Sequence, residues 1–211
     1  MGQHLAQAQE HLNATSEVMA GLISRFVPPP IHPKPPDLYF DVLVASIIGQ
    51  QLSVKAADTI EARFRLLAGE MSPQRILELE PPDMREQGLS YSKISYIHAL
   101  AEAFHAGSID PHALEKLPEP EIKECLTAVK GIGLWTAEMF MIFGMGRPDI
   151  WSPGDLGLRK ALWALFGEDA DLTETSNDWA PYRSYASLYL WKFWDERPKT
   201  PKTASQGTPT N

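Results

Sequence analysis

Two glycines flank one apolar residue in Lys130-Gly131-Ile132-Gly133, the segment whose residue types and spacing most directly suggest chemistry. Glycines permit a tight turn with positive φ and leave backbone N–H groups uncovered. A helical pattern begins directly afterwards, so its first amides are also free and its dipole is positive there. The segment therefore predicts an anion site, with phosphate as the favoured guest. A plain helix–helix connection with a glycine C-cap explains the same residues.

One aspartate, Asp155, stands at the start of a later helical pattern, after Ile150-Trp-Ser-Pro-Gly. Its simplest role is to cap that helix by accepting free backbone amides, worth roughly 1 kcal/mol. A charged carboxylate fixed beside a phosphate-binding turn would also stabilise a sugar cation or orient a water molecule. The two roles are compatible.

Helices must position these residues, because apolar side chains recur every three or four residues through most of the chain. The predicted helices run over 38–48, from Ser53, from Ser92, and over 119–128, 134–143, 156–166 and 182–194, with short pieces after Pro73 and Pro111. A weaker amphipathic helix is expected around 18–26, followed by an extended proline-rich connector over 28–36. The predicted class is all-α.

One helical domain over residues 1–196 accommodates these elements, with the hairpin at about 119–144. Residues 197–211 are polar, contain proline and lack aromatic side chains, so they are predicted to form a disordered tail.

Composition excludes several classes of protein. Apolar residues make up 44% and charged residues 22% of the 211 residues, as in an ordinary soluble domain. The single cysteine, Cys125, excludes an intrachain disulfide and a four-cysteine iron–sulfur cluster. Neither a membrane helix nor a signal-peptide pattern is present in the sequence, so we expect a cytoplasmic protein with no membrane partner. The net charge of −8 argues against non-specific binding to polyanions, although it says nothing about one local face.

Four segments, in order along the chain, carry a family resemblance. Residues 126–140, with the glycine turn, and Ser152-Pro-Gly-Asp155 resemble the helix–hairpin–helix motif and the Gly/Pro-rich loop with aspartate (GPD) of the DNA glycosylase superfamily. Residues 47–57 and 179–191 resemble its alkylpurine branch, the 3-methyladenine DNA glycosylase II family. The resemblance spans about Leu38 to Trp194. It implies a two-lobed helical fold, in a compact form without the N-terminal sheet domain of longer members.

The resemblance also implies site residues. Asp155 matches the catalytic aspartate, Trp135 and Trp191 match aromatic walls of the base pocket, and Gln51 matches the side chain that wedges into the duplex. The residues that match the phosphate-binding hairpin are Gly131, Ile132, Gly133 and Thr136. No side-chain metal site and no required cofactor are implied. A structural monovalent cation, Na⁺ or K⁺, is expected at hairpin carbonyls, those of Thr127, Val129 and Ile132.

Two departures from the family pattern bear on substrate choice. Gln51 replaces an apolar wedge, and Met139 stands where an aromatic pocket residue is usual. A third departure bears on reaction type: Trp135 occupies the position of the lysine that attacks the sugar in the lyase branch. Since no amine is available there, a Schiff-base step is not expected.

The resemblance implies a monofunctional DNA glycosylase that flips alkylated purines out of duplex DNA and hydrolyses their N-glycosidic bond. N3-methyladenine and N7-methylpurines are the expected substrates, and Asp155 would stabilise the oxocarbenium-like sugar, orient the water, or both. We expect a monomer of bacterial type, associated with the nucleoid. The alternatives are a glycosylase for other damaged bases, with or without strand nicking, a non-catalytic hairpin-based DNA-binding module, and a helical protein-interaction scaffold.

Overall fold

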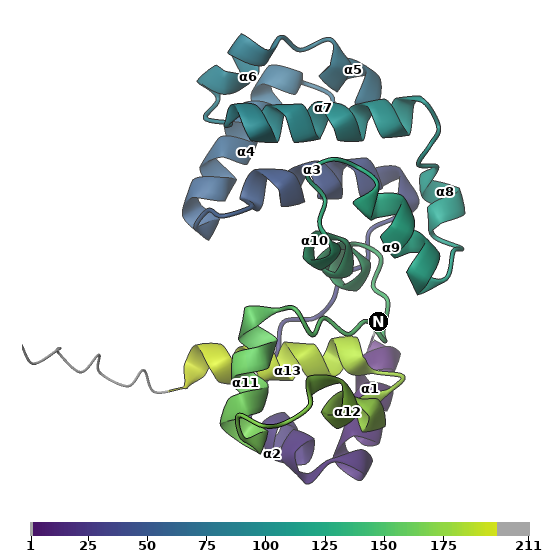
Figure 1. Cartoon of the computed structure of the whole chain (residues 1–211), viewed down its shortest axis with the longest axis vertical. Helices are drawn as coiled ribbons and strands as arrows, with labels where there is room; N and C mark the ends of the chain where they lie inside the picture. The colour runs from purple at the N-terminus through teal and green to yellow at the C-terminus, as the bar shows by residue number, and fades with distance from the viewer. Residues whose placement is uncertain (1, 198–211) are drawn as a thin grey trace, which may run out of the picture.

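The computed structural model describes residues 2–197, with side chains described from residue 4 onward. All regular structure in this range is helical, which confirms the predicted all-α class. The predicted tail, apart from Arg197, lies outside the described residues. The helices form two lobes joined by extended segments (Figure 1).

The first lobe holds the middle of the chain. It contains α3 (Tyr39–Gly49), α4 (Val54–Ala68), α5 (Pro73–Leu77), α6 (Pro81–Glu86), α7 (Tyr91–His105), α8 (Pro111–Leu114), α9 (Glu119–Thr127) and α10 (Leu134–Met139). The 3₁₀ turn η1 (Pro36–Leu38) precedes α3, and the π turn η2 (Phe140–Gly144) extends α10. Helix α3 lies at the centre and packs against α4, α7 and η2. Its Tyr39 ring meets Phe140 edge-on at 5.1 Å between ring centroids.

The second lobe combines the N-terminal and C-terminal parts of the described residues. It contains α1 (Gly2–Thr15), α2 (Glu17–Arg25), α11 (Leu156–Phe166), α12 (Leu172–Ser176), the 3₁₀ turn η3 (Asn177–Trp179) and α13 (Arg183–Glu196). Helix α13 is its core and packs against α11, α2 and α1. The proline-rich segment crosses between the lobes as an extended chain without regular structure over 28–35, as predicted, whereas Pro36, the last residue of the predicted connector, begins η1.

Helix α1 is absent from the sequence-based prediction, which expected only one helix near residues 18–26. Its sequence is mostly polar, and Ala8 and Leu12 are the side chains it buries completely. Such a narrow stripe carries little periodic signal, and packing against the rest of the lobe stabilises the helix instead. Helix α7 also begins earlier than predicted, because Ser90 rather than Ser92 caps it by accepting the Lys93 amide at 3.2 Å.

Helix N-caps elsewhere agree with the sequence. Ser53 caps α4 by accepting the Ala56 amide at 3.4 Å, and Pro73 and Pro111 occupy the first turns of α5 and α8. No helix within residues 2–197 is long and apolar enough to cross a membrane.

Candidate active site

The turn between α9 and α10 is a tight hairpin. Gly131 has φ of +94°, a backbone conformation that side-chain-bearing residues rarely adopt. A Cβ atom at this position would lie 2.1 Å from Cγ of Tyr96, so only glycine fits without displacing α7. Ile132 is buried and anchors the turn. Gly133 caps α10 and is exposed, and nothing lies within 4 Å of the Cβ it lacks.

The first amides of α10 have no partners within the helix, since they precede its first hydrogen-bonded turn. Thr136 supplies one of these amides, but its side chain is buried, with Oγ1 3.5 Å from Nε2 of Gln50. Any phosphate contact of Thr136 therefore falls to its backbone N–H. The carbonyl of Val129 accepts the Ile132 amide at 3.1 Å and closes the turn.

Asp155 caps α11, and its carboxylate also accepts bonds from outside that helix. Oδ1 accepts the Leu158 amide at 2.8 Å and the indole N–H of Trp191 at 2.8 Å. Oδ2 accepts the indole N–H of Trp135 at 2.7 Å. The structure thus brings together three residues that the sequence analysis singled out from separate segments.

These bonds leave the carboxylate with spare accepting capacity. A carboxylate has about four lone-pair sites, and three N–H donors engage Asp155, two of them on Oδ1. One lone-pair site on Oδ2 therefore has no donor from the protein. Asp155 is only 9% exposed, so its position is set by its partners rather than by solvent.

The two tryptophans differ in accessibility. Trp135, on the first turn of α10, is 49% exposed, while Trp191, on α13, is half-buried. Residues 147–150, which precede the Asp155 loop, hold the start of α13: Ser184 Oγ donates to the Arg147 carbonyl at 2.7 Å, and Arg183 forms an ion pair with Asp149 at 2.7 Å. The sequence segment that leads to Asp155 therefore also positions Trp191.

A further aromatic residue, Phe143, belongs to this site and is missing from the sequence-based prediction. Its ring lies 5.8 Å from Trp191, centroid to centroid, and it is 43% exposed although it is large and apolar. Trp135, Met139 and Phe143 recur every four residues, but this spacing drifts off one face of a regular helix, so it gives only a weak signal for Phe143.

The π turn η2 helps to place Phe143. In a regular α-helix a residue eight positions on is rotated by about 80° from the first. The Met145 amide instead bonds to the carbonyl of Phe140, five residues back, which widens this turn and returns Phe143 toward the face of Trp135. π turns of this kind often occur at functional sites.

Gln51 lies at the turn between α3 and α4, exposed to solvent and beside Trp135. Among residues 2–197 it is the only non-glycine residue with positive φ, at 59°. It lines a pocket of about 360 Å³ together with Gln50, Leu52, Trp135 and Met139. The predicted wedge and the predicted base-stacking indole thus share one cavity.

An ion pair between a buried glutamate and a partly exposed lysine supports the loop before Asp155. Glu138 of α10 is 3% exposed, accepts the Ser152 hydroxyl at 2.5 Å and lies 3.3 Å from Nζ of Lys123. Burial opposes the charge on Lys123, but its hydrogen bond to Glu119 and the charge of Glu138 raise its pKa. The hairpin helices α9 and α10 therefore hold Ser152 and, through it, the loop that carries Asp155.

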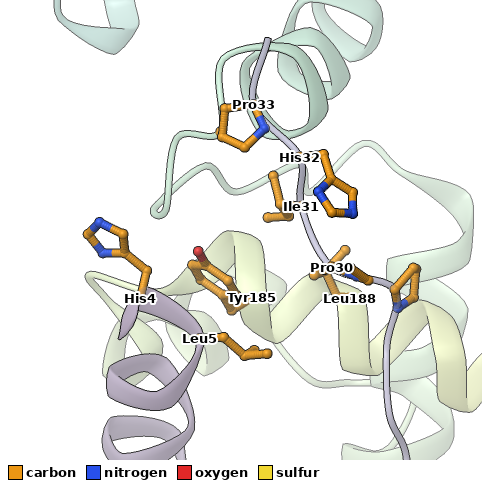
Figure 2. Close-up of a pocket in the computed structure, with 10 residues that line it drawn as sticks. His4, Leu5, Pro30, Ile31, His32, Pro33, Tyr185 and Leu188 are labelled. Carbon is orange, nitrogen blue, oxygen red and sulfur yellow. The ribbon is translucent and has the colours of Figure 1, made fainter. Parts of the chain in front are cut away.

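A second pocket of about 190 Å³ lies between α1, the proline-rich segment and α13 (Figure 2). Apolar and proline side chains form most of its lining. His4, His32 and Tyr185 also line it. Neither Asp155 nor either site tryptophan lines it. Within residues 2–197, no cluster of three or more His, Cys, Asp and Glu side chains is arranged to hold a metal ion.

This combination of hairpin, loop and capping aspartate has a counterpart among known protein families. The family model described as HhH-GPD superfamily base excision DNA repair protein matches residues 44–180. That range includes the Gln51 turn, the hairpin and Asp155. The chain therefore belongs to the HhH-GPD superfamily of base excision DNA repair proteins.

Two solved structures of DNA glycosylases are similar to this chain. The crystal structure of a DNA-3-methyladenine glycosidase from Bacillus halodurans superposes with a TM-score of 0.81 at 36% identity, covering 90% of this chain and 89% of that chain. A 3-methyladenine DNA glycosylase from Schizosaccharomyces pombe, solved in complex with abasic DNA, superposes with a TM-score of 0.79 at 30% identity. This match covers 90% of this chain and 97% of that chain.

Among curated proteins, DNA-3-methyladenine glycosylase 1 of Schizosaccharomyces pombe is 34% identical over 162 residues, which are 72% of this chain and 71% of that protein. Other relatives are longer: the chain spans 58% of the length of a Bacillus subtilis relative that is 31% identical over 166 residues.

Proposed function

We propose that this protein removes alkylated purines, N3-methyladenine and N7-methylpurines, from duplex DNA by hydrolysing the N-glycosidic bond. The observation that carries the proposal is the carboxylate of Asp155, held between the indole N–H groups of Trp135 and Trp191. The similarity to a glycosylase solved with abasic DNA supports duplex DNA as the partner.

Base recognition rests on the aromatic side chains around the carboxylate. Alkylation at N3 or N7 gives the purine a positive charge, and an indole face attracts such a cation by about 0.5–2 kcal/mol, depending on desolvation. Trp135 is exposed toward the pocket that contains Gln51. Trp191, which donates to Oδ1 of Asp155, forms an aromatic pair with Phe143.

The reaction itself needs a negative charge near the sugar. The base leaves with the bonding electrons, and the sugar develops oxocarbenium character that the Asp155 carboxylate stabilises. Water then adds to C1′, and its proton passes to the Asp155 carboxylate and from there to solvent. The open acceptor site on Oδ2 suits a hydrogen bond from that water. Because a cationic base is a good leaving group, the electrostatic role is the larger one.

A base must leave the stack before this bond is accessible, at a cost of a few kcal/mol. Gln51 fills the vacated space from the α3–α4 turn, and its amide is suited to hydrogen-bond the orphaned base. Backbone amides of Gly131, of Gly133 and of the start of α10 hold a neighbouring phosphate, whereas the Ile132 amide is already bonded to the Val129 carbonyl. The carbonyls of Thr127, Val129 and Ile132 would hold a Na⁺ or K⁺ ion there. The Val129 carbonyl also accepts the Ile132 amide, but a carbonyl oxygen has a second lone pair that can bind the ion.

The direct test is release of methylpurines from methylated duplex DNA by the purified protein. Appearance of free N3-methyladenine or N7-methylguanine, with abasic sites left in the DNA, is the expected result. Binding to the same DNA without release of any base would instead identify a non-catalytic hairpin module.

Strand cleavage through an enzyme–sugar imine is not expected, because Trp135 stands where an attacking lysine would be needed. Borohydride added during the reaction should therefore trap no covalent protein–DNA adduct, as judged by denaturing gel electrophoresis. A glycosylase known to form an imine serves as the positive control. A trapped adduct would contradict the assignment of Trp135.

DNA affinity should depend only modestly on salt. Two cations near the site are already engaged: Arg147 donates to main-chain carbonyls of Glu115 and Leu117, and Lys192 pairs with Glu196 at 2.6 Å. Backbone amides bind phosphate without displacing many counterions, so we expect a slope of log K against log salt of about −2 to −4. Binding isotherms over a range of NaCl concentrations measure this slope, and a value near −8 would contradict the expectation.

A further inference from the structure

A lysine of another helix forms hydrogen bonds to the backbone of the α3–α4 turn. Lys93, in the first turn of α7, donates from Nζ to the carbonyls of Ile48 and Gln50, both at 2.7 Å. Helices α7 and α3 run alongside each other in the first lobe, which brings this side chain to the end of α3 (Figure 1). Burial of the amine lowers the pKa of Lys93, consistent with an ammonium group that has exchanged water for two backbone oxygens.

These bonds complete the end of α3. The Gln50 amide bonds back to the Ile47 carbonyl at 3.3 Å, and the Leu52 amide to the Gly49 carbonyl at 3.2 Å. Lys93 supplies the donor for the carbonyl of Ile48, between them in sequence. The four successive carbonyls of residues 47–50 thus each accept a hydrogen bond immediately before the left-handed residue, Gln51. Such a conformation persists only when its surroundings over-determine it.

The same turn is also bonded to the hairpin. Nε2 of Gln50 donates to the carbonyl of Gly131 at 3.0 Å and lies 3.5 Å from Oγ1 of Thr136. The chain positions on either side of this contact are 81 residues apart. One residue, Gln50, therefore receives the Lys93 ammonium on its carbonyl and binds the phosphate-holding turn through its side chain.

We propose that Lys93 and Gln50 are positioning residues. They hold the backbone at Gln51, and with it the wedge side chain, in a fixed position relative to the hairpin. The inference rests on the proposed function and adds to it a reason why insertion into the duplex and phosphate binding act together. A wedge that is rigid before DNA binds loses little conformational freedom on insertion, so more of the binding energy drives extrusion of the nucleotide.

A positioning role of this kind is specific to paired DNA. In a duplex the wedge must displace a stacked, paired nucleotide, whereas a single strand presents its base without that cost. Loss of Lys93 should therefore impair release of an alkylated base from duplex DNA and leave release from the same single strand nearly intact. A residue that only stabilised the fold would affect both substrates equally.

The experiment compares Lys93→Met, Lys93→Arg and wild type in single-turnover release of one N-alkylpurine from a matched duplex and single strand. We expect Lys93→Met to slow the duplex reaction at least 10-fold and the single-strand reaction less than 2-fold. Arginine also donates to two carbonyls and should restore most of the duplex rate. Lys116→Met, which removes an exposed lysine of the same charge, is the control and should match wild type.

A double variant tests whether Lys93 and Gln51 serve the same function. Gln51→Ala should give the same duplex-specific defect, and the double variant with Lys93→Met should be no slower than the slower single variant, because the two changes remove one function. Additive defects, equal losses on both substrates, or an unchanged duplex rate in Lys93→Met would each overturn the proposal.

Amide hydrogen exchange gives a readout that does not depend on catalysis. In Lys93→Met the amides of residues 49–53 should exchange at least 10-fold faster, while those of α13 stay as in wild type. Unchanged exchange at the turn would overturn the positioning role. If wild type released no alkylated base from either substrate, the proposed function would fail, yet this measurement would still decide whether Lys93 fixes the turn.

Discussion

Asp155→Asn should lower the single-turnover rate of methylpurine release by about 10²–10³-fold, the range expected when a preorganised electrostatic group is lost. Asparagine has nearly the same shape but no charge, so it cannot offset the positive charge that develops on the sugar. It also converts one oxygen into an N–H donor. Because Leu158 and Trp191 both need the oxygen acceptor, the new donor would face the indole N–H of Trp135.

The fold should tolerate this change, because Asn and Asp are about equally good helix N-caps. The melting temperature and the affinity for abasic-site DNA serve as controls and should stay close to wild type. Trp135→Phe removes the same indole hydrogen bond but keeps the carboxylate charge, so its loss of rate should be smaller. A release rate for Asp155→Asn within threefold of wild type would remove the proposed mechanism.

Gly131→Ala should destabilise the protein by about 3 kcal/mol or more. Two costs add up: a side chain at φ of +94°, of order 1–3 kcal/mol, and a methyl group placed 2.1 Å from the Tyr96 ring, of similar size. For a chain of this length the melting temperature should fall by roughly 6–12 °C. Thermal and urea unfolding measure the effect.

Gly133→Ala is the matched control within the same hairpin. Its backbone has φ of −88°, and a Cβ there would meet no atom within 4 Å, so we expect a loss below about 1 kcal/mol. The added methyl group would instead stand in the open space where phosphate approaches the first amides of α10. Gly133→Ala should therefore fold normally but bind DNA more weakly. Equal melting temperatures for the two variants would contradict the distinct roles of the glycines.

Much of the local structure was predictable because its causes lie close together in the sequence. The glycine turn, the buried Ile132, and the caps at Ser53 and Asp155 follow from residue types within a few positions of each other. Helix α11 begins and ends where predicted, since an N-cap and Gly167 bound it. Helix α1 was not predicted, because its apolar stripe is narrow and its stability depends on the rest of the lobe.

The site was predicted only in part. Its position at a helix start indicated Asp155, and family resemblance added Trp135 and Trp191, but neither indicated that both indoles donate to one carboxylate. Phe143 was missed because a regular helix would carry it away from the Trp135 face, and the π turn that returns it has no clear sequence signature. The buried side chain of Thr136 likewise follows from packing against Gln50.

The sequence by itself determined the helical class, the hairpin that exposes amides, and the aspartate at the head of a helix, because each depends on local backbone preference and capping. Only the tertiary structure decided what those parts face. The bonds to Asp155 join residues 20 and 36 positions apart, and the Lys93 and Gln50 bonds span 43 and 81 positions. Contacts at such separations arise when buried helix faces pack together, and no periodicity within one helix specifies which polar groups then meet.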